Sequence, residues 1–212
     1  MKVSSVKTNR AGNRRTEGFT LIEMIGVLAV IAILAALLLP KVFSAINDAR
    51  VNNAAVSAET VKTAVTDHYG KFGKLNSIFG TNDQTAPVAA YDKVILMAES
   101  LLDKPFATKI AGGDPSTNSV VHLVAGGSEN ATASPKGFLL DGTGATSTTN
   151  AQYVIEAVLY NVSANDAKDL NDRIDGLALG AGNVTSADTK GRVEYAAPSA
   201  GATDVYIYIT GR

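Results

Sequence analysis

The feature that most constrains this chain is an apolar run at residues 19–39, which contains a single charged side chain, Glu23. A helix of these 21 residues would be about 31 Å long, close to the thickness of the hydrocarbon core of a bilayer. Residues 1–18 are polar and carry five basic side chains against one acidic one. Basic flanks stay on the cytoplasmic side of a membrane, so the sequence predicts one span with the remaining chain outside. A carboxylate in such a span is costly, so Glu23 is expected to have a partner and a function.

A secretory signal peptide and a plain single-span anchor are the two simpler interpretations of this segment. The run is longer than the apolar part of a signal peptide, which covers about 7–15 residues. An Ala-x-Ala cleavage site could be drawn within residues 32–36, but three leucines at 37–39 continue the run past it. Neither interpretation explains why a carboxylate stands at position 23.

The order of residues at the start of the run is more specific. Residues 18–23 read GFTLIE, directly after a basic leader and directly before uninterrupted apolar residues. This stretch resembles the processing signal of type IV pilins and type II secretion pseudopilins, whose motif G-F-T-L-[IV]-E it matches at every position. The resemblance implies that a membrane peptidase cuts between Gly18 and Phe19 and methylates the new amine of Phe19. It also implies that the apolar segment is retained, and that Glu23 pairs with the Phe19 amine of the same or a neighbouring subunit.

Pro40 follows the apolar run and has no backbone N–H to donate to a helix. Helical character resumes after it, so we expect a bend at Pro40, with a simple helix stop as the alternative. Pilins often carry a proline at this distance from the cut, so the resemblance groups Pro40 with Phe19 and Glu23 as assembly residues.

The helical pattern continues beyond the proline, because residues 42–69 contain no Gly or Pro and are rich in Ala. We therefore expect three parts: a cleaved basic leader at 1–18, a long helix at 19–69, and a globular pilin-like head at 70–212. Within the helix, residues 19–39 are the transmembrane and assembly segment, and Gly70 and Gly73 are expected to end it. The predicted apolar stripe of its second half consists of Val42, Ala45, Ala49, Val56, Val61, Ala64 and Val65.

The head is predicted to contain short helices and an antiparallel sheet, so the fold class is α+β. The β-branched and aromatic content of several segments favours strands, with the last one lying centrally in the sheet. The expected strands are residues 120–124, 137–140, 152–160, 192–196 and 205–209. The expected helices are residues 91–102 and 163–174, the second with Ser163 or Asn165 as its cap and Gly176 at its end.

The sequence carries little that indicates catalysis. There is no cysteine, and the two histidines, His68 and His122, have no G-x-S-x-G motif to accompany them. Residues 142–144 read GTG but do not continue as a dinucleotide-binding fingerprint. We therefore expect a structural protein and not an enzyme.

Calcium is the one cofactor that the resemblance raises, because major pseudopilins hold it in a C-terminal loop. The candidate ligands Asp166, Asp169, Asp172 and Asp175 are spaced by three, which places them along one helix face that is usually solvated. No D-x-[DN]-x-[DN]-G loop is present. We expect no cofactor, with calcium as the alternative.

The uneven charge of the chain bears on its partners. The leader carries a net side-chain charge of +4, so the remainder carries −5 when the whole chain is at −1. A mildly acidic mature protein is not expected to bind nucleic acid generally, since phosphate contacts need clustered Lys and Arg.

These observations predict a structural subunit of a type IV pilus or a type II secretion pseudopilus. The resemblance implies partners of three kinds: other pilins, the prepilin peptidase and an inner-membrane assembly platform. It implies a bacterial inner-membrane location with a cytoplasmic N-terminus, followed by a periplasmic or extracellular filament. The alternatives are a membrane-tethered periplasmic binding protein or enzyme with a fortuitous motif, and a DNA-uptake pilin.

Overall fold

The computed structural model describes residues 18–114, 117–126, 137–140, 152–176, 179 and 182–212. The predicted leader therefore lies outside the described residues except for Gly18, and so does the GTG stretch at 142–144. The chain divides into two units, Met1–Ser44 and Ala45–Arg212. Helix α1 (Leu21–Phe72) contributes residues to both, and the units are described in turn.

In the first unit, α1 passes through Pro40 without interruption. Helix on both sides of the proline is thus confirmed, and a simple helix stop is wrong. Pro40 cannot donate to the carbonyl of Ala36, four residues earlier, whereas Ser44 Oγ donates to the Pro40 carbonyl at 3.1 Å. The bend at this position stays a prediction. Of the described helices, only α1 has the length and composition needed to cross a membrane.

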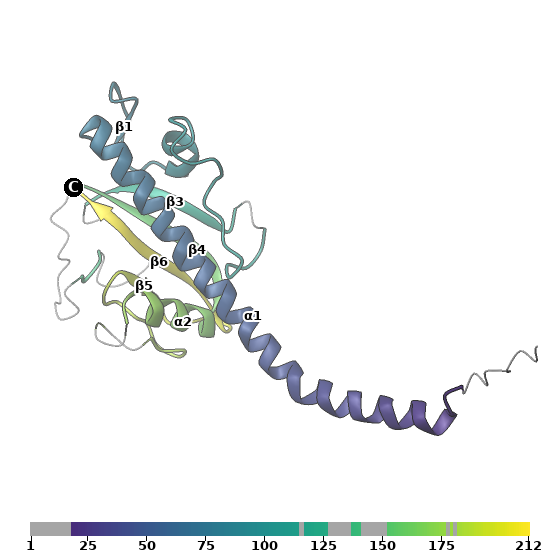
Figure 1. The fold of residues 1–212 in the computed structure, drawn as a ribbon. Coiled ribbons are helices and arrows are strands. Elements are labelled where there is room, and N and C mark those ends of the chain that lie inside the picture. The colour runs from purple at the N-terminus through teal and green to yellow at the C-terminus, as the bar shows by residue number, and fades with distance from the viewer. Residues whose placement is uncertain (1–17, 115–116, 127–136, 141–151, 177–178, 180–181) are drawn as a thin grey trace, which may run out of the picture. The chain divides into compact units, whose positions relative to one another are not determined.

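The second unit is built on a four-stranded antiparallel sheet in the order β3–β4–β6–β5 (Figure 1). Its strands are β3 (Ser119–Ala125), β4 (Tyr153–Ser163), β5 (Val193–Tyr195) and β6 (Ala202–Gly211). The central place predicted for the last strand is confirmed, because β6 pairs with both β4 and β5. A long N-terminal helix with an antiparallel sheet confirms the α+β class.

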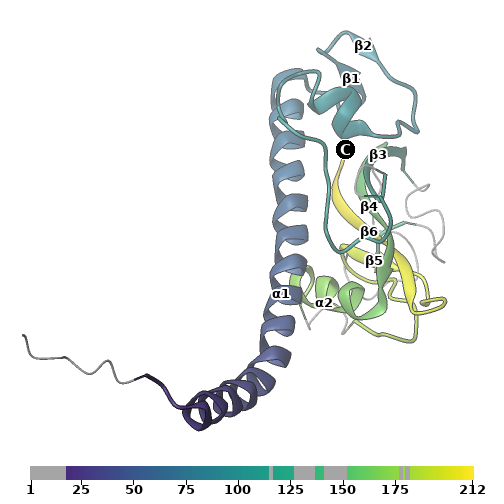
Figure 2. The same ribbon diagram turned by 90° about the vertical axis from the view of Figure 1, so that its right-hand side faces the viewer.

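The core of this unit lies between α1 and one face of the sheet (Figure 2). The side chains of α1 that are buried there recur every three or four residues, as on one face of a helix. They are Val51, Ala54, Ala58, Val61, Ala64, Val65 and His68. The predicted stripe was partly wrong: it included Val56, which is 57% exposed, and Val42, Ala45 and Ala49, which are exposed as well.

Helix α2 (Ala164–Ile174) follows β4 directly and packs into the same core through Ala167 and Leu170. Ser163 is its N-cap, because the side chain accepts the Asp166 N–H at 3.2 Å. Gly176 follows the helix with a φ of 70°. The predicted cap and end of this helix are confirmed.

The predicted strand at residues 137–140 is wrong. These residues are irregular and largely buried, because they bond to side chains and turns instead of a strand ladder. The Leu139 N–H donates to Glu194 Oε1 at 3.0 Å, and the Gly191 N–H donates to the Leu139 carbonyl at 2.9 Å. Phe138 joins a second apolar cluster on the sheet face opposite α1, together with Val154, Val158 and Tyr206.

The segment before β3 also differs from the predicted end of the long helix and from the predicted helix at 91–102. Helix α1 extends to Phe72, and a two-stranded hairpin of β1 (Ser77–Ile78) and β2 (Asn82–Asp83) follows it. The helix predicted at 91–102 is a short π-helix, η1 (Asp92–Leu96), whose Met97 N–H bonds to the Asp92 carbonyl five residues earlier. Ser100 then takes a φ of 57°, which is incompatible with further helix.

Candidate functional site

The candidate processing site lies just outside the first turn of α1. Gly18, Phe19 and Thr20 are exposed and have no regular structure, so the peptide bond between Gly18 and Phe19 is not part of the helix. A Cβ added to Gly18 would meet nothing within 4 Å. Packing within the described chain therefore does not require glycine at this position.

Glu23 has a partner within the uncleaved chain, and that partner is Thr20. The Glu23 carboxylate accepts the Thr20 N–H at 2.8 Å and the Thr20 hydroxyl at 2.7 Å. In return, the Glu23 N–H donates to Thr20 Oγ1 at 3.4 Å. This reciprocal arrangement is a capping box, which satisfies N–H groups that the first helical turn leaves unpaired. A negative charge at a helix N-terminus is also favourable for the helix dipole.

Thr20 is the residue that the sequence reasoning missed at this site. Its signal was present, since T-x-x-E directly before an apolar run is the pattern of a capping box. The pairing of Glu23 with the Phe19 amine stays a prediction, because the Phe19 nitrogen of this chain is an amide joined to Gly18.

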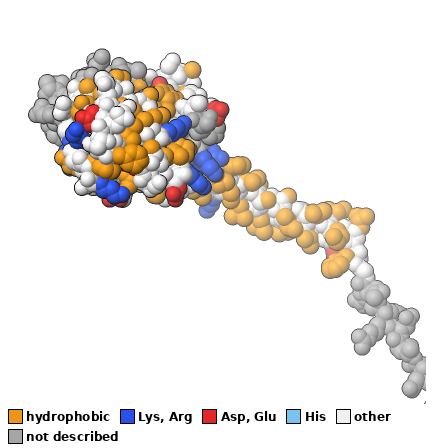
Figure 3. All heavy atoms as spheres, turned by 90° about the horizontal axis from the view of Figure 1, so that it is seen from above, with side chains coloured by type: hydrophobic (Ala, Val, Ile, Leu, Met, Phe, Trp, Pro, Cys, Tyr) orange, Lys and Arg blue, Asp and Glu red, His pale blue; other side chains and the backbone are white. Residues whose placement is uncertain are grey.

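The apolar segment behind this cap has no cover within its own unit. Every large hydrophobic side chain at residues 19–39 is at least 51% exposed, and Figure 3 shows hydrophobic side chains over the visible face of this helical segment. Burying one such side chain is worth about 1.5–3 kcal/mol. A strip of this length therefore requires a membrane or other protein around it.

The first of the two histidines lies in a buried polar network at the end of α1. His68 Nδ1 is 2.6 Å from Glu99 Oε2, and Glu99 Oε1 accepts the Phe79 N–H at 2.7 Å. The neighbouring Tyr91 hydroxyl donates to the Leu75 carbonyl at 2.8 Å, and burial raises the pKa of Tyr91 far above its usual value. The first of these contacts ties Glu99 to α1, and the other two bonds join segments outside the helix to one another.

Three of the four aspartates considered for calcium accept hydrogen bonds from other parts of the chain. Asp166 accepts from the side chain of Asn47, and Asp172 accepts from Lys168 and from the Gly182 N–H. Asp175 accepts the N–H groups of Arg192 and Val193 at 2.9–3.0 Å.

Burial raises the pKa of Asp175 and of Asp188, although hydrogen bonds to both carboxyls oppose that shift. Within the described ranges, no group of three or more metal-ligating side chains converges. Calcium binding itself stays untested.

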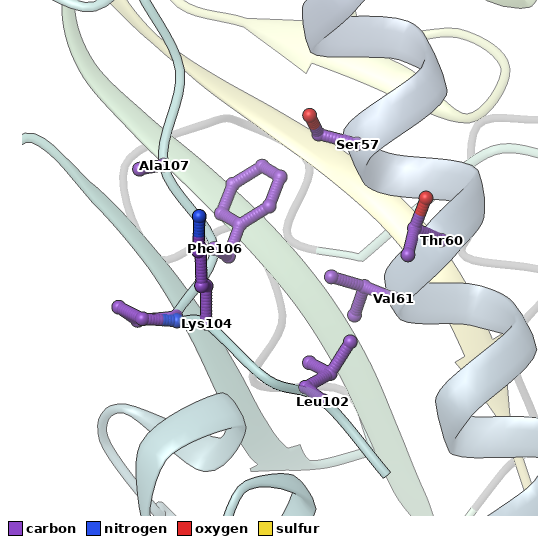
Figure 4. Close-up of a pocket in the computed structure, with 8 residues that line it drawn as sticks. Ser57, Thr60, Val61, Leu102, Lys104, Phe106 and Ala107 are labelled. Atoms are coloured by element: carbon purple, nitrogen blue, oxygen red, sulfur yellow. The ribbon is translucent and has the colours of Figure 1, made fainter.

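One pocket lies between the second half of α1 and residues 102–107 (Figure 4). It encloses about 130 Å³ and is lined by Ser57, Thr60 and Val61 of the helix and by Leu102, Lys104 and Phe106 opposite. Neither a carboxylate nor a histidine stands among these side chains.

Comparison with known proteins finds one family whose sequence pattern covers the candidate processing site. The family described as the prokaryotic N-terminal methylation motif matches residues 13–39. A type IV major pilin protein, PilE1, of Neisseria gonorrhoeae is 40% identical over 78 residues, which is 37% of this chain and 45% of that protein. A fimbrial protein of Neisseria meningitidis serogroup A is also 40% identical over 78 residues, covering 37% of this chain and 44% of the relative.

The chain therefore spans less than half the length of the curated relatives that it matches. No solved structure matches it. The similarity thus concerns a limited part of the chain, which leaves most of the head to be interpreted from its own structure.

Proposed function

We propose that this chain is a type IV pilin and serves as a structural subunit of a type IV pilus. The observation that carries the proposal is the combination at residues 18–39. A glycine with no steric need to be glycine precedes Phe19, a carboxylate stands in the first helical turn, and the apolar strip behind it is exposed along its length.

The proposed processing begins with cleavage between Gly18 and Phe19 by the prepilin peptidase, followed by methylation of the new Phe19 amine. Cleavage creates a positive charge four residues from Glu23. A carboxylate that caps its own helix through Thr20 is already held at the end of the segment where that amine appears. Pairing with the amine of a neighbouring subunit would then be available only to processed chains, and it would set their axial register.

The proposed assembly exchanges one apolar environment for another. In the inner membrane the strip at 19–39 is covered by lipid, and in a filament it is covered by the same strip of other copies. Transfer between the two costs little hydrophobic free energy, because both surroundings are apolar. Self-assembly, other pilins and an inner-membrane platform are the partners of this scheme, and it requires no enzymatic activity and no cofactor.

The names of the matched relatives, a major pilin and a fimbrial protein, favour a pilus over a secretion pseudopilus. For DNA uptake, a basic patch would be needed on the head. The Lys and Arg side chains of the head are spread along the sequence from Lys71 to Arg212, so we do not extend the proposal to DNA.

The test is to express the chain together with prepilin peptidase and a pilus assembly system. Mass spectrometry of the mature protein should find an N-methylated Phe19 at its start. Glu23→Ala should still be cleaved but should enter filaments poorly. Asp48→Ala, which removes an exposed carboxylate from the same helix, should assemble normally.

An unprocessed Met1 start, or cleavage at another bond, would contradict the proposed processing. Normal filament incorporation of Glu23→Ala in cells without the wild-type copy would contradict the role of Glu23. Separate measurement of cleavage and of assembly distinguishes the two failures.

A further inference from the structure

The hairpin of β1 and β2, which lies at the C-terminal end of α1 (Figure 2), presents an aromatic side chain to solvent. Phe79 follows β1 and is 58% exposed, and its backbone has a φ of 53°. This left-handed conformation is rare for a bulky residue. It is unfavourable by itself and persists only where the surrounding structure enforces it, which is most common at functional sites. An exposed ring on such a backbone is therefore a candidate for binding.

The buried pair of His68 and Glu99 enforces this conformation. Glu99 Oε1 accepts the Phe79 N–H at 2.7 Å, and Glu99 Oε2 lies 2.6 Å from His68 Nδ1 on α1. On the other side of the turn, a Cβ added to Gly80 would lie 2.8 Å from Cδ1 of Phe72, so the turn rests against the last residue of the helix. The backbone of Phe79 is thus fixed to α1 before any partner binds, which lowers the entropic cost of binding.

A groove that suits such a ring lies between α1 and the end of α2. It encloses about 260 Å³, whereas an apolar cavity of about 150 Å³ already holds a benzene ring. Val56, which is 57% exposed, lies in this Val56 groove. Among the described residues of the second unit, Phe79 and Val56 are the two most exposed large hydrophobic side chains. The other residues that line the groove are Ala55, Glu59, Arg173, Ile174 and Arg192.

The polar walls of the Val56 groove also favour an aromatic ring. Arg192 Nη2 donates to Glu59 Oε1 at 3.0 Å. Arg173 Nη1 donates to Asn52 Oδ1 at the same distance. These bonds hold two guanidinium groups beside the apolar side chains of the groove. The face of an aromatic ring carries partial negative charge and is attracted to a guanidinium group, so a single ring can gain both an apolar and an electrostatic contact here.

Phe79 of the same chain cannot fill this groove. Sixteen residues of α1 separate Val56 from Phe72, which is about 24 Å of helix, and the hairpin tip is fixed at the far end. A second copy of the chain can supply the ring. The ring and the groove are different surfaces of one chain, so the contact between copies is heterologous. Contacts of this type generate rings or open helical filaments, because each copy still has a free ring or groove for the next.

We propose that Phe79 of one copy docks in the Val56 groove of a neighbouring copy and thereby links their heads along the filament. The inference rests on the proposed pilus function and adds to it a defined contact between heads. It also gives a role to the buried pair of His68 and Glu99, which holds the docking residue in its left-handed conformation.

The test uses filaments sheared from cells that express the full chain with a pilus assembly system and lack the wild-type copy. The chain contains no cysteine, so thiol crosslinking between chains has no background. In the double variant Phe79→Cys/Val56→Cys, a short bis-maleimide should convert the filaments into a ladder of covalent multimers well beyond the dimer. Each single-cysteine variant should give no multimers, and filaments that contain both single variants should give dimers only.

Phe79→Cys/Val94→Cys is the matched control, because Val94 is also exposed but does not line the groove; it should give no ladder. As a second measurement, Phe79→Ala filaments should dissociate at a lower temperature than the wild type, whereas Phe79→Leu filaments should stay close to it.

Filaments of the Phe79→Cys/Val56→Cys variant that give no ladder would overturn the proposed contact and leave the pilus function standing. Should that variant not assemble, an unchanged dissociation temperature in Phe79→Ala would overturn the contact instead. Failure of the wild-type chain to form any filament would overturn both proposals.

Discussion

At the residue scale, Thr20 and Glu23 give the first turn of α1 its own internal cap. The carboxylate holds the N–H and hydroxyl of Thr20, while the hydroxyl accepts the N–H of Glu23. The charge that is unusual in an apolar segment thus has a local structural role before any other subunit is present. Under the proposed processing, any partner gained by Glu23 has to compete with these bonds or share the carboxylate with them.

Thr20→Val should loosen the start of α1. The change removes the hydroxyl but keeps the shape, and loss of an N-cap of this type costs about 0.5–2 kcal/mol. Faster amide hydrogen exchange at residues 21–24 in micelles would measure it. Thr66→Val is the matched control, because the Thr66 hydroxyl only bonds back to the Lys62 carbonyl within the same helix. Equal exchange in both variants would show that the cap contributes nothing.

His122 should make the stability of the protein depend on pH. Burial lowers the pKa of this imidazole in the folded state, so the unfolded chain binds a proton first as the pH falls. The contribution is therefore complete above the unfolded value of about 6.5 and is lost as the pH falls from there through the folded pKa. The groups that face it are Asp92 of η1 and Glu156 of β4.

Denaturant unfolding of the wild type and of His122→Asn between neutral and mildly acidic pH measures this contribution. The free energy of unfolding of the wild type should fall more steeply with decreasing pH than that of the variant. Parallel curves for the two proteins would contradict the lowered pKa.

At the element scale, the connection from α2 to β5 depends on one carboxyl. Asp175 is the residue directly after α2, and it accepts the N–H groups of Arg192 and Val193 at the start of β5. In the same region, the side-chain amide of Asn171 donates a hydrogen bond to the Asp188 carboxyl. Short edge strands have few ladder bonds, so β5 relies on these side-chain bonds to stay attached.

Gly191→Ala should weaken this connection. Gly191 has a φ of +86°, and an added Cβ would lie 2.7 Å from the Asp175 carboxyl carbon. That carboxyl cannot move aside without breaking its bonds to β5, so the clash adds about 1–3 kcal/mol to a backbone strain of about 1–2 kcal/mol. The control is Gly201→Ala, with a φ of +83° and nothing within 4 Å of the added atom. Equal loss of thermal stability in the two variants would rule out the clash.

How well each element could be predicted from the sequence depends on how local its causes are. Helix α2 and strands β4 and β6 carry long periodic patterns, and all three were predicted. Residues 137–140 have strand-like composition, but their conformation is decided by Glu194, which lies 55 positions away from Leu139. The π-helical turn η1 could likewise not be predicted, because a pattern of apolar residues does not distinguish a π-helix from an α-helix.

The candidate sites divide in the same way. Gly18, Phe19 and Glu23 follow one another closely, so a local motif identifies them, and Thr20 could have been found with them. The Val56 groove could not be predicted, because residues of α1, of the end of α2 and of the segment just before β5 meet there.

At the scale of the whole molecule, the hydrophobic core is confined to the second unit. The described core cluster begins at Val51 and includes side chains of α1, α2 and the sheet. Residues 19–39 contribute nothing to it. The stability of the head therefore does not depend on burial of the apolar strip at 19–39, which needs a different partner.

A chain that consists of residues 45–212 should accordingly be soluble without detergent and should keep its tertiary structure. Its near-ultraviolet circular dichroism, which reports on the buried tyrosines, should match that of the full chain in micelles. The control is a chain that ends at residue 201 and so lacks β6, the strand that pairs with both β4 and β5; it should not fold. Aggregation of the 45–212 chain would contradict the separation.

The capping box has a consequence for where the chain can be cut. Proteases bind their substrates as extended backbone, and a helix that began three residues earlier, at Gly18, would include the bond between Gly18 and Phe19 in its first turn. Thr20 and Glu23 fix the start of the helix at Leu21, which leaves that bond outside. The Glu23 carboxylate thus helps to determine where the helix begins. The residues before that point are accessible as extended backbone, and the residues after it are helical.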